Sequence, residues 1–555
     1  MSGYFERHRD WLAGALDANQ TRGHWTPFVE SPSRKLHPDG ARDRGEAAFK
    51  ARLNRDFELD LPGTNGAAGA EVSPYTAEPL GIRYPTVDAP ALFDAMEAAQ
   101  PRFAEARPAE RVGVCLEMLA RWNATVFENA YATMHTAGQS FMMAFAGSGA
   151  NSLDRGLEAL AWAHHAMSAI PEHAVFERTF GRTPVRLDKR YRLHPRGIAV
   201  VFSCGTYPAW NAYPAVLANL ATGNPVTVKP HPGCILPMAR MVEIGRDVLA
   251  DAGFDPNVLT LAVDRSDRLV GKELLGEPRT AIVDFTGGAG FGGWIEENCR
   301  RLLVYTETAG CNSVVLESAD RLAPVLRAIA HSLCIFSSQM CTAAQNIFVP
   351  ASGVRTSSGI VAYEEVLEAL AQEVDALTEN AAPAAALCGA IMSEQTLRDI
   401  ERFEAQADRL LRPSGTFAHP DFPNARTRTP AIAAVDAAET TYRREFFGPM
   451  AFAIRCDSRD HALKRATEDA KNHGAIASYA YTVDEAFEDA VVQAHSRAGA
   501  SVGVNLIGQL PINYTAAYSD FHVTGLNPAG TACLADPAFV ASRFRITQSK
   551  IERAR

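Results

Sequence analysis

The stretch that decides the fold lies between residues 197 and 285, where short apolar segments alternate with longer amphipathic ones. The apolar segments read GIAVVFSC (197–204), PVTVK (225–229), VLTLAV (258–263) and AIVDF (281–285). Apolar side chains at nearly every position indicate strands that are buried on both faces. The sequence MARMVEIGRDVLADAGF, between the second and third strands, has helical spacing and stops at Gly253. This alternation predicts an α/β fold with a parallel sheet covered by helices, a layout typical of nucleotide binding.

A second α/β series follows the first. Between about residues 304 and 478, strands are predicted at Ser313–Leu316, Asn346–Val349 and Ala451–Arg455, with long helical patterns between them. The chain therefore contains two α/β units in succession.

Segments outside the two series differ in pattern. Residues 172–195 alternate polar and apolar side chains around a turn, which predicts a projecting two-stranded arm. Helices are expected at Pro90–Gln100 and Arg111–His135. We interpret residues 1–70 as a polar, irregular extension with a loop, and the tail after Gly508 as packed loops plus an arm.

The composition excludes several classes of protein. The 555 residues carry a formal charge of −10, which argues against nucleic acid or an anionic membrane as the main partner. The ten cysteines are scattered singly, without the spacing of a zinc site or a disulfide framework, so we expect no metal and a reducing compartment. The first residues do not resemble a signal peptide, and no apolar run is long enough to span a membrane. We therefore expect a cytoplasmic protein.

A glycine-rich segment follows the fourth apolar strand. Residues 288–293, GAGFGG, fit the pattern G-x-G-x-x-G and open a helical sequence. Glycines at such a place let backbone N–H groups approach a phosphate at a helix N-terminus. An ordinary glycine-bearing turn explains the same pattern about equally well.

Four side chains suggest chemistry, and each has a plainer explanation. Cys341 precedes a strand and could be a nucleophile or a buried thiol. Glu307 ends a strand, where a carboxylate can face a site or only solvent. Asn211 could be a helix cap. Lys229 ends a strand and could hold an anion or a sugar, or be exposed.

Together and in this order, these features resemble the aldehyde dehydrogenase superfamily. Six segments carry the resemblance: YPAWNAYP (207–214), GNPVTVKP (223–230), FTGGAGFG (285–292), ETAG (307–310), QMC (339–341) and REFFGP (444–449). More narrowly, FERHR, TRGHWTPFVESPS, MHTAGQ and the tail YSDFHVTGLNPAG to FRITQSK resemble its PaaN branch, named for phenylacetate degradation.

The resemblance implies roles for individual residues. Cys341 would be the nucleophile, Glu307 the general base and Asn211 the amide that holds the oxyanion. The cofactor would be NAD or NADP, bound by a larger set: Lys229, His231, Phe285, Thr286, Gly287, Gly288, Gly292, Glu445 and Phe447.

Some positions depart from the family pattern. Pro232 stands where members that prefer NAD place a Glu, and His231 and Lys229 lie close to it in sequence, which favours NADP. Gly288 and Gly290 replace the Ser and Glu of the familiar loop, and Cys311 replaces a Lys, which affects the expected pose of the cofactor.

The resemblance also implies an organisation into domains. We expect an aldehyde dehydrogenase-like fold with a Rossmann-like cofactor-binding domain (71–171 and 196–306), an oligomerisation arm (172–195) and an α/β catalytic domain (307–490). An N-terminal extension (1–70) and a C-terminal segment with an oligomerisation or lid role (491–555) complete the chain, in a homodimer or homotetramer.

The implied reaction is oxidation of an aldehyde to an acid through a thiohemiacetal and a thioester on Cys341. For the PaaN branch the substrate would be a ring-opened semialdehyde linked to coenzyme A. Two alternatives stay open: an enzyme that transfers the acyl group to coenzyme A, and a catalytically impaired scaffold that binds the cofactor. Glu307 argues against the first, and the joint presence of Cys341, Glu307 and Asn211 against the second.

Overall fold

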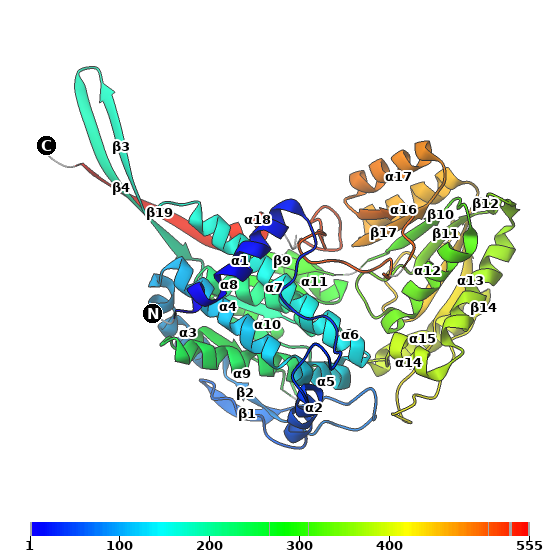
Figure 1. Cartoon of the computed structure of the whole chain (residues 1–555), viewed down its shortest axis with the longest axis horizontal. Helices are drawn as coiled ribbons and strands as arrows, with labels where there is room; N and C mark the ends of the chain where they lie inside the picture. The colour runs from blue at the N-terminus through cyan, green and yellow to red at the C-terminus, as the bar shows by residue number, and fades with distance from the viewer. Residues whose placement is uncertain (1–2, 266, 309, 509, 532–535, 553–555) are drawn as a thin grey trace.

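The computed structural model describes residues 3–265, 267–308, 310–508, 510–531 and 536–552. Two α/β bodies lie side by side, and a β arm projects from the first (Figure 1). The first body contains a parallel five-stranded sheet in the order β7-β6-β5-β8-β9. Its strands are β5 (Ile198–Phe202), β6 (Val226–Lys229), β7 (Leu259–Leu261), β8 (Thr280–Thr286) and β9 (Leu303–Glu307). The parallel sheet predicted from the apolar segments is thus confirmed.

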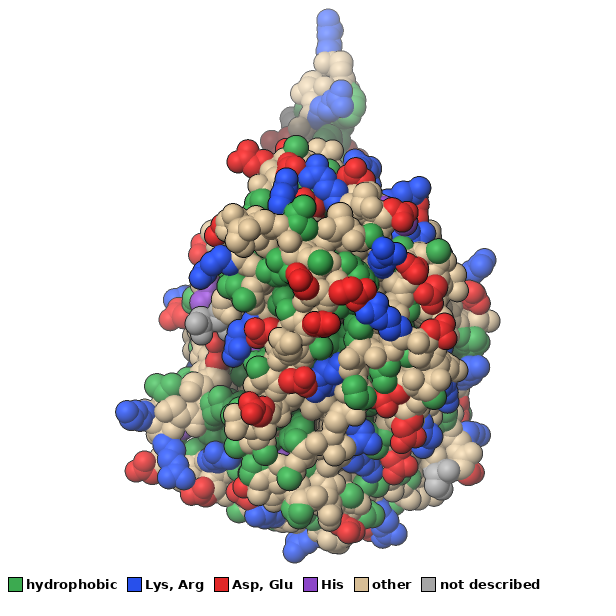
Figure 2. Space-filling view, turned by 90° about the vertical axis from the view of Figure 1, so that its right-hand side faces the viewer, with side chains coloured by type: hydrophobic (Ala, Val, Ile, Leu, Met, Phe, Trp, Pro, Cys, Tyr) green, Lys and Arg blue, Asp and Glu red, His purple; other side chains and the backbone are tan. Residues whose placement is uncertain are grey.

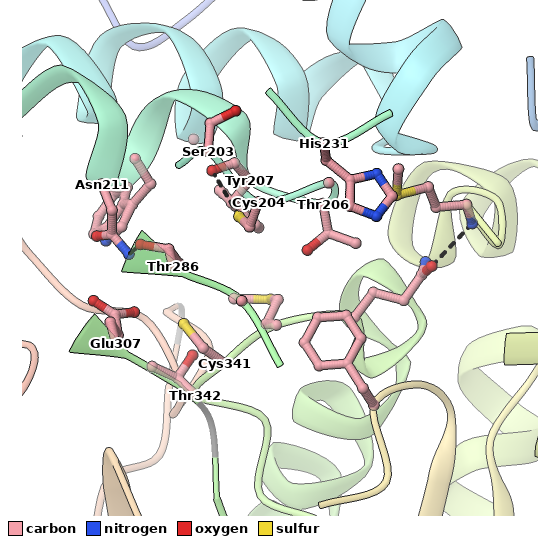
Figure 3. A pocket seen from close by; sticks show the side chains of 18 of the residues that line it. Ser203, Cys204, Thr206, Tyr207, Asn211, His231, Thr286, Glu307, Cys341 and Thr342 are labelled. Carbon is pink, nitrogen blue, oxygen red and sulfur yellow. Dashed lines mark hydrogen bonds between the residues drawn. The ribbon is translucent and has the colours of Figure 1, made fainter. Parts of the chain in front are cut away.

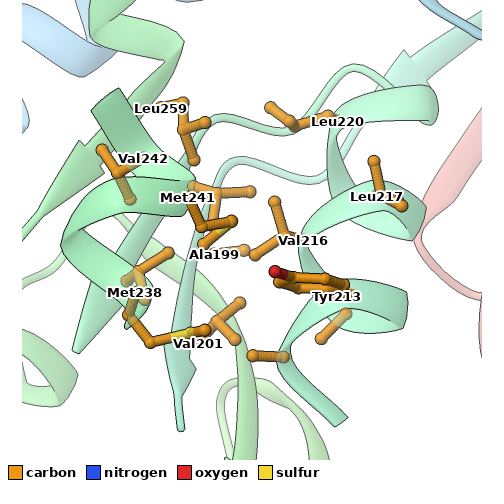
Figure 4. Close-up of a cluster of buried hydrophobic side chains, with 14 of the residues drawn as sticks. Ala199, Val201, Tyr213, Val216, Leu217, Leu220, Met238, Met241, Val242 and Leu259 are labelled. Atoms are coloured by element: carbon orange, nitrogen blue, oxygen red, sulfur yellow. The ribbon is translucent and has the colours of Figure 1, made fainter. Parts of the chain in front are cut away.

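Two helices cover one face of this sheet. Helix α8 (Pro208–Ala221) and helix α9 (Leu236–Asp251) each turn an apolar stripe toward β5 (Figure 4). The buried cluster contains Ala199, Val201, Val216, Leu217, Leu220, Met238, Met241 and Val242. Burial of each large aliphatic side chain contributes about 1.5–3 kcal/mol, so this layer fixes where the carboxyl ends of the strands lie.

The second body contains a seven-stranded sheet in the order β14-β15-β16-β11-β10-β17-β18. Only β14 pairs antiparallel to its neighbour. Its strands are β10 (Ser313–Leu316), β11 (Asn346–Pro350), β14 (Leu410–Arg412), β15 (Ala431–Asp436), β16 (Met450–Cys456), β17 (Ala477–Tyr481) and β18 (Ser501–Val504). The helices around it are α12 (Leu322–Cys334), α13 (Tyr363–Thr378), α14 (Ala381–Cys388), α15 (Glu394–Gln406), α16 (Arg459–His473) and α17 (Glu485–Ala498). The second predicted α/β series is confirmed.

The arm has three strands rather than two. Strands β3 (His173–Phe180) and β4 (Thr183–Pro195) form the predicted hairpin, with Gly181 in the turn at φ 63°. Strand β19 (Phe544–Glu552) returns from the C-terminal tail and pairs antiparallel with the other side of β4 (Figure 1). The tail therefore contributes an arm, as expected, and it widens the hairpin.

The interpretation of residues 1–70 as irregular is wrong. Helices α1 (Tyr4–Thr21) and α2 (Ala41–Arg52) form there and pack on the first body. Mostly polar side chains and glycines weaken the helical pattern in the sequence. Gly45 is required by packing, because an added Cβ would lie 2.4 Å from the Cβ of Phe127.

The single helix expected at Arg111–His135 is two helices, α4 (Pro108–Ala124) and α5 (Val126–Ala137). The Thr125 hydroxyl between them donates to the Trp122 carbonyl at 3.0 Å. Such local side-chain bonds compete with the helix ladder, which accounts for the break. The expected helix at Pro90–Gln100 is present within α3 (Ala89–Glu105).

The outer surface carries charges of both signs. Figure 2 shows Lys and Arg side chains interspersed with Asp and Glu over one face of the molecule. Within the described part of the chain, no helix is both long and apolar enough to cross a membrane.

Candidate active site

A cavity of about 1120 Å³ lies where the carboxyl ends of β5, β6, β8 and β9 face the second body. Pockets for small ligands usually measure about 300–1,000 Å³, so this cavity has room for a cofactor and a substrate together. All but one of the predicted site residues line it: Asn211, Lys229, His231, Phe285, Thr286, Gly287, Gly288, Glu307, Cys341, Glu445 and Phe447. The exception is Gly292. An added Cβ there would lie 2.5 Å from Thr308 Cγ2, so the glycine permits close packing against Thr308.

The glycine-rich segment forms the N-terminus of helix α11 (Ala289–Asn298). Gly288 is the residue that precedes the helix, and an added Cβ at Gly288 or Gly290 would meet nothing within 4 Å. Exposed backbone N–H groups at a helix N-terminus suit a phosphate. The open wall and the size of the cavity fit a dinucleotide, and phosphate binding by this segment stays a prediction.

Lys229, the last residue of β6, lies beside a carboxylate. Its ammonium donates to Asp264, with which it forms an ion pair, and to the Pro230 carbonyl at 3.2 Å. Burial, with a smaller contribution from the Lys229 charge, lowers the pKa of His231 to about 4. His231 is therefore neutral near pH 7, and the charge of Lys229 is already compensated.

Cys341 follows a backbone segment of unusual conformation. Phe336, Ser337 and Ser338 all have φ near +50°, a left-handed region that side chains other than glycine rarely occupy. The Cys341 carbonyl accepts a hydrogen bond of 2.7 Å from the Asn312 side chain. Asn312 is 2% exposed, so it fixes the Cys341 segment from the start of the second sheet.

The Cys341 thiol keeps some exposure to the cavity, yet its surroundings disfavour the thiolate. Burial raises the pKa of this thiol well above its ordinary value, and the Glu307 carboxylate raises it further. Activation of the sulfur therefore requires a nearby group that stabilises negative charge.

Glu307 ends β9 and is almost completely buried, with 2% of its surface exposed. Its carbonyl accepts from the Gly287 amide at 3.1 Å, and its backbone pairs with Gly530 of the tail. Burial by itself would raise the pKa of this carboxyl. Attraction and hydrogen bonding from His522, with smaller help from Asn211 and Cys341, lower the pKa below its ordinary value instead. The carboxylate is therefore ionised at neutral pH.

Asn211 lies in the first turn of α8, one of the elements that Figure 3 shows around the site. Its Nδ2 donates to Thr286 Oγ1 at 3.1 Å. It is inside the helix, so the helix-cap explanation of this residue is wrong. In Figure 3 its side chain lies with those of Glu307 and Cys341 at the same end of the cavity.

Glu445 also faces the cavity, and burial raises its pKa to about 7. Near neutral pH the protonated and ionised forms of this carboxyl are both populated.

The sequence prediction missed His522. Its Nε2 lies 3.0 Å from Glu307 Oε1 and 3.5 Å from Cys341 Sγ, and the side chain is 3% exposed. It belongs to the tail segment YSDFHVTGLNPAG, and the 181 residues between it and Cys341 hide the contact from sequence analysis.

The three groups could also act as metal ligands. The donor atoms of Glu307, Cys341 and His522 lie within 4.8 Å of one another. Thiolate, imidazole and carboxylate are the ligands that zinc prefers. The same three groups suit covalent chemistry, so the expectation of no resident metal stays a prediction.

Comparison with known proteins places these features in context. Residues 65–506 match the model of the aldehyde dehydrogenase family. A crystal structure of an NAD-dependent aldehyde dehydrogenase from Burkholderia multivorans is 45% identical, with a TM-score of 0.97, over 100% of this chain and 99% of that one. Geranial dehydrogenase of Castellaniella defragrans is 28% identical over 63% of this chain and 68% of its own length. The 1-pyrroline-5-carboxylate dehydrogenase of Thermus thermophilus, at 16% identity and a TM-score of 0.74 over 96% of this chain and 100% of that one, shares the fold.

Proposed function

Because this chain belongs to the aldehyde dehydrogenase family, we propose that it oxidises an aldehyde to a carboxylic acid with Cys341 as nucleophile. One observation carries the proposal. Three elements far apart in the sequence bring the thiol of Cys341, the ionised carboxylate of Glu307 and the amide of Asn211 to one end of the cavity.

The residues divide the work as follows. Cys341 Sγ attacks the carbonyl carbon, and the electron pair of the C=O bond moves to oxygen, where the Asn211 amide holds the charge. A bound nicotinamide dinucleotide supplies the hydride acceptor that turns the resulting thiohemiacetal into a thioester. Glu307 then takes a proton from water, whose oxygen attacks the thioester carbon. The C–S bond breaks, the acid leaves and the thiolate is restored.

For the cofactor we propose NAD or NADP, held along Phe285–Gly288 with its sugar end near Lys229 and Glu445 toward the nicotinamide ribose. Pro232 favours NADP, because no carboxylate stands there to repel a 2′-phosphate. Asp264 opposes that preference, since it pairs with Lys229, and His231 carries no charge near pH 7. The NAD-dependent relative and the Thermus enzyme with bound NAD support use of NAD. The ratio of kcat/KM with NADP to kcat/KM with NAD measures which cofactor the protein prefers.

For the substrate we propose an aldehyde whose reacting end is largely apolar. The cavity wall near Cys341 includes Met143, Tyr207, Trp210 and Met340. The resemblance to the PaaN branch makes a semialdehyde linked to coenzyme A, from aromatic ring degradation, the specific candidate. Glu307 favours hydrolysis of the thioester over transfer to coenzyme A, because a buried base is in place.

For the assembly we propose a homodimer or homotetramer that uses the arm. Val175 and Phe180 on β3, and Ile546 on β19, are 45%, 50% and 46% exposed. Apolar side chains on edge strands of a projecting sheet suit pairing with another copy. Light scattering would test this: a monomer at all concentrations would contradict it.

A panel of aldehydes with NAD and with NADP, followed by the absorbance of the reduced nicotinamide, tests the proposed function. The wild type is expected to oxidise at least one apolar aldehyde without coenzyme A, and Cys341→Ala to show no turnover while keeping its thermal midpoint. Retained turnover in Cys341→Ala, or an absolute need for coenzyme A, would contradict the proposal.

A further inference from the structure

One imidazole nitrogen faces two reacting groups at once. His522 Nε2 is 3.0 Å from the Glu307 carboxylate and 3.5 Å from the Cys341 sulfur. The ring packs against Trp210, with centroids 5.9 Å apart. The His522 ring therefore touches the two side chains to which the proposed reaction assigns the nucleophile and the base.

The partners of the ring indicate where its hydrogen is. The distance of 3.0 Å from Nε2 to an ionised carboxylate oxygen requires a hydrogen between the two atoms. Nδ1 is buried and has no hydrogen-bond partner among the residues that the structure describes. Nε2 therefore carries a hydrogen, and Nδ1 has no acceptor that would receive a second one.

We propose that the Nε2–H of His522 is a further catalytic group, which donates a hydrogen bond to the Cys341 thiolate. The inference deepens the proposed function, since it explains how that nucleophile forms. The S–H bond breaks, the proton leaves to water in the cavity and the electron pair stays on sulfur. The hydrogen bond that Nε2–H donates then shifts from the Glu307 oxygen to the sulfur, while the covalent N–H bond stays intact and the ring neither gains nor loses a proton.

The surroundings of the thiol make such a donor necessary. The groups that act on its ionisation are Glu307, Cys204 and Glu445, and the phenols of Tyr207 and Tyr479 also face it. All of these are acids, neutral or negative, and none attracts a thiolate charge. Hydrogen bonds to an ionised partner are roughly twice as strong as those between neutral groups. One N–H that points at the sulfur therefore stabilises the thiolate more than it stabilises the thiol.

The tail that carries His522 is held firmly from both bodies. Arg155, which is 1% exposed, donates to the carbonyls of Ala516 at 2.6 Å and Asp520 at 3.2 Å. Thr342, next to the nucleophile, donates to the Asn513 carbonyl at 2.9 Å. These bonds fix the ring relative to the thiol before any substrate arrives, as a catalytic donor requires.

Two substitutions at one position separate hydrogen-bond donation from mere packing. His522→Phe keeps an aromatic ring beside Trp210 but has no donor, and His522→Gln keeps an N–H at about the same reach but cannot titrate. The measured quantity is the rate at which iodoacetamide alkylates Cys341 between pH 6 and 10, followed by mass spectrometry of the peptide that contains it. If His522→Phe does not fold, His522→Met, which also lacks a donor, takes its place.

In the wild type and His522→Gln, the pH midpoints for alkylation are expected to agree within about half a unit. In His522→Phe the midpoint is expected to rise by about one unit or more, so alkylation at neutral pH slows about tenfold. An unchanged profile in His522→Phe would overturn the inference. So would a His522→Gln profile like that of His522→Phe, because a titrating ring would then be required.

The experiment needs neither aldehyde nor cofactor. If the variants behave as expected while the wild type oxidises no aldehyde, the proposed function fails and the inference stands. If aldehyde oxidation is robust but the alkylation profiles coincide, only the inference fails.

Discussion

Replacing Glu307 with Gln should separate the two halves of the reaction. The amide has the shape of the carboxylate, so the backbone contacts of residue 307 with Gly287 and Gly530 should persist. It cannot take a proton from water, and at 2% exposure bulk solvent does not substitute for the lost base. Loss of a general base typically costs about 10²–10⁴ in rate, or about 2.7–5.4 kcal/mol. The first turnover should survive.

The pH dependence follows from the direction of the pKa shift. Because the pKa of Glu307 is below its ordinary value, the base form is fully present above the ordinary carboxyl pKa of about 4.3. It is lost only as the pH falls through the lowered folded value. Thioester hydrolysis in the wild type should therefore not weaken between about pH 5 and 8 through this group, and Glu307→Gln should lack its acid limb.

Stopped-flow absorbance of the reduced nicotinamide measures both phases. We expect a burst near one equivalent per active site, followed by a slow steady state, in Glu307→Gln. Glu297→Gln is the matched control, because this exposed carboxylate on α11 lies outside the cavity wall. A steady-state rate in Glu307→Gln within about threefold of the wild type would refute the assignment, since a lost base costs more.

Three further substitutions and one added metal test other parts of the account. Asn211→Ala should lower kcat/KM by about 10²–10³, as for loss of one oxyanion donor, and an equal kcat/KM would exclude that role. Arg155→Met removes the ion-pair partner of Glu158, which is 1% exposed and keeps the Tyr518 amide as a donor to its Oε1. Breaking a buried ion pair typically costs about 3–5 kcal/mol, so calorimetry should show a lower thermal midpoint. Asp264→Asn removes a negative charge beside Lys229 and should raise kcat/KM for NADP relative to NAD; an unchanged ratio would show that this carboxylate does not discriminate. Zn²⁺ should inhibit turnover reversibly, with recovery by EDTA, because thiol, imidazole and carboxylate converge; full activity in excess Zn²⁺ would contradict this.

The parallel strands were predictable because their signal is local. The predicted strand Ser313–Leu316 coincides with β10, since all its side chains are buried and the flanking residues break the apolar run. The segments QMC and ETAG were singled out by their resemblance to family motifs, and the roles of Cys341 and Glu307 stay predictions. The helices of residues 1–70 were not predictable, because α1 is stabilised by contacts with α4 and α7 rather than by a clear apolar stripe.

His522 could not be predicted for a different reason. Its place depends on the tail returning along β9, where the Thr531 amide donates to the Thr306 carbonyl at 2.8 Å and the Thr308 amide to the Ala529 carbonyl at 2.7 Å. Such pairing joins residues more than 200 positions apart and leaves no periodic trace in the sequence. The compensation of Lys229 by Asp264 is hidden likewise, because Asp264 follows the neighbouring strand.

The central claim is that an acyl group forms on one particular sulfur. The Glu307→Gln enzyme is mixed with an oxidisable aldehyde and nicotinamide dinucleotide, and the reaction is quenched in acid during the burst. The protein is then digested, and the masses of its peptides are measured by mass spectrometry. The peptide containing Cys341 is expected to gain the mass of the acyl group, in step with the reduced cofactor. Reduced cofactor without an adduct, or an adduct on another cysteine, would contradict it.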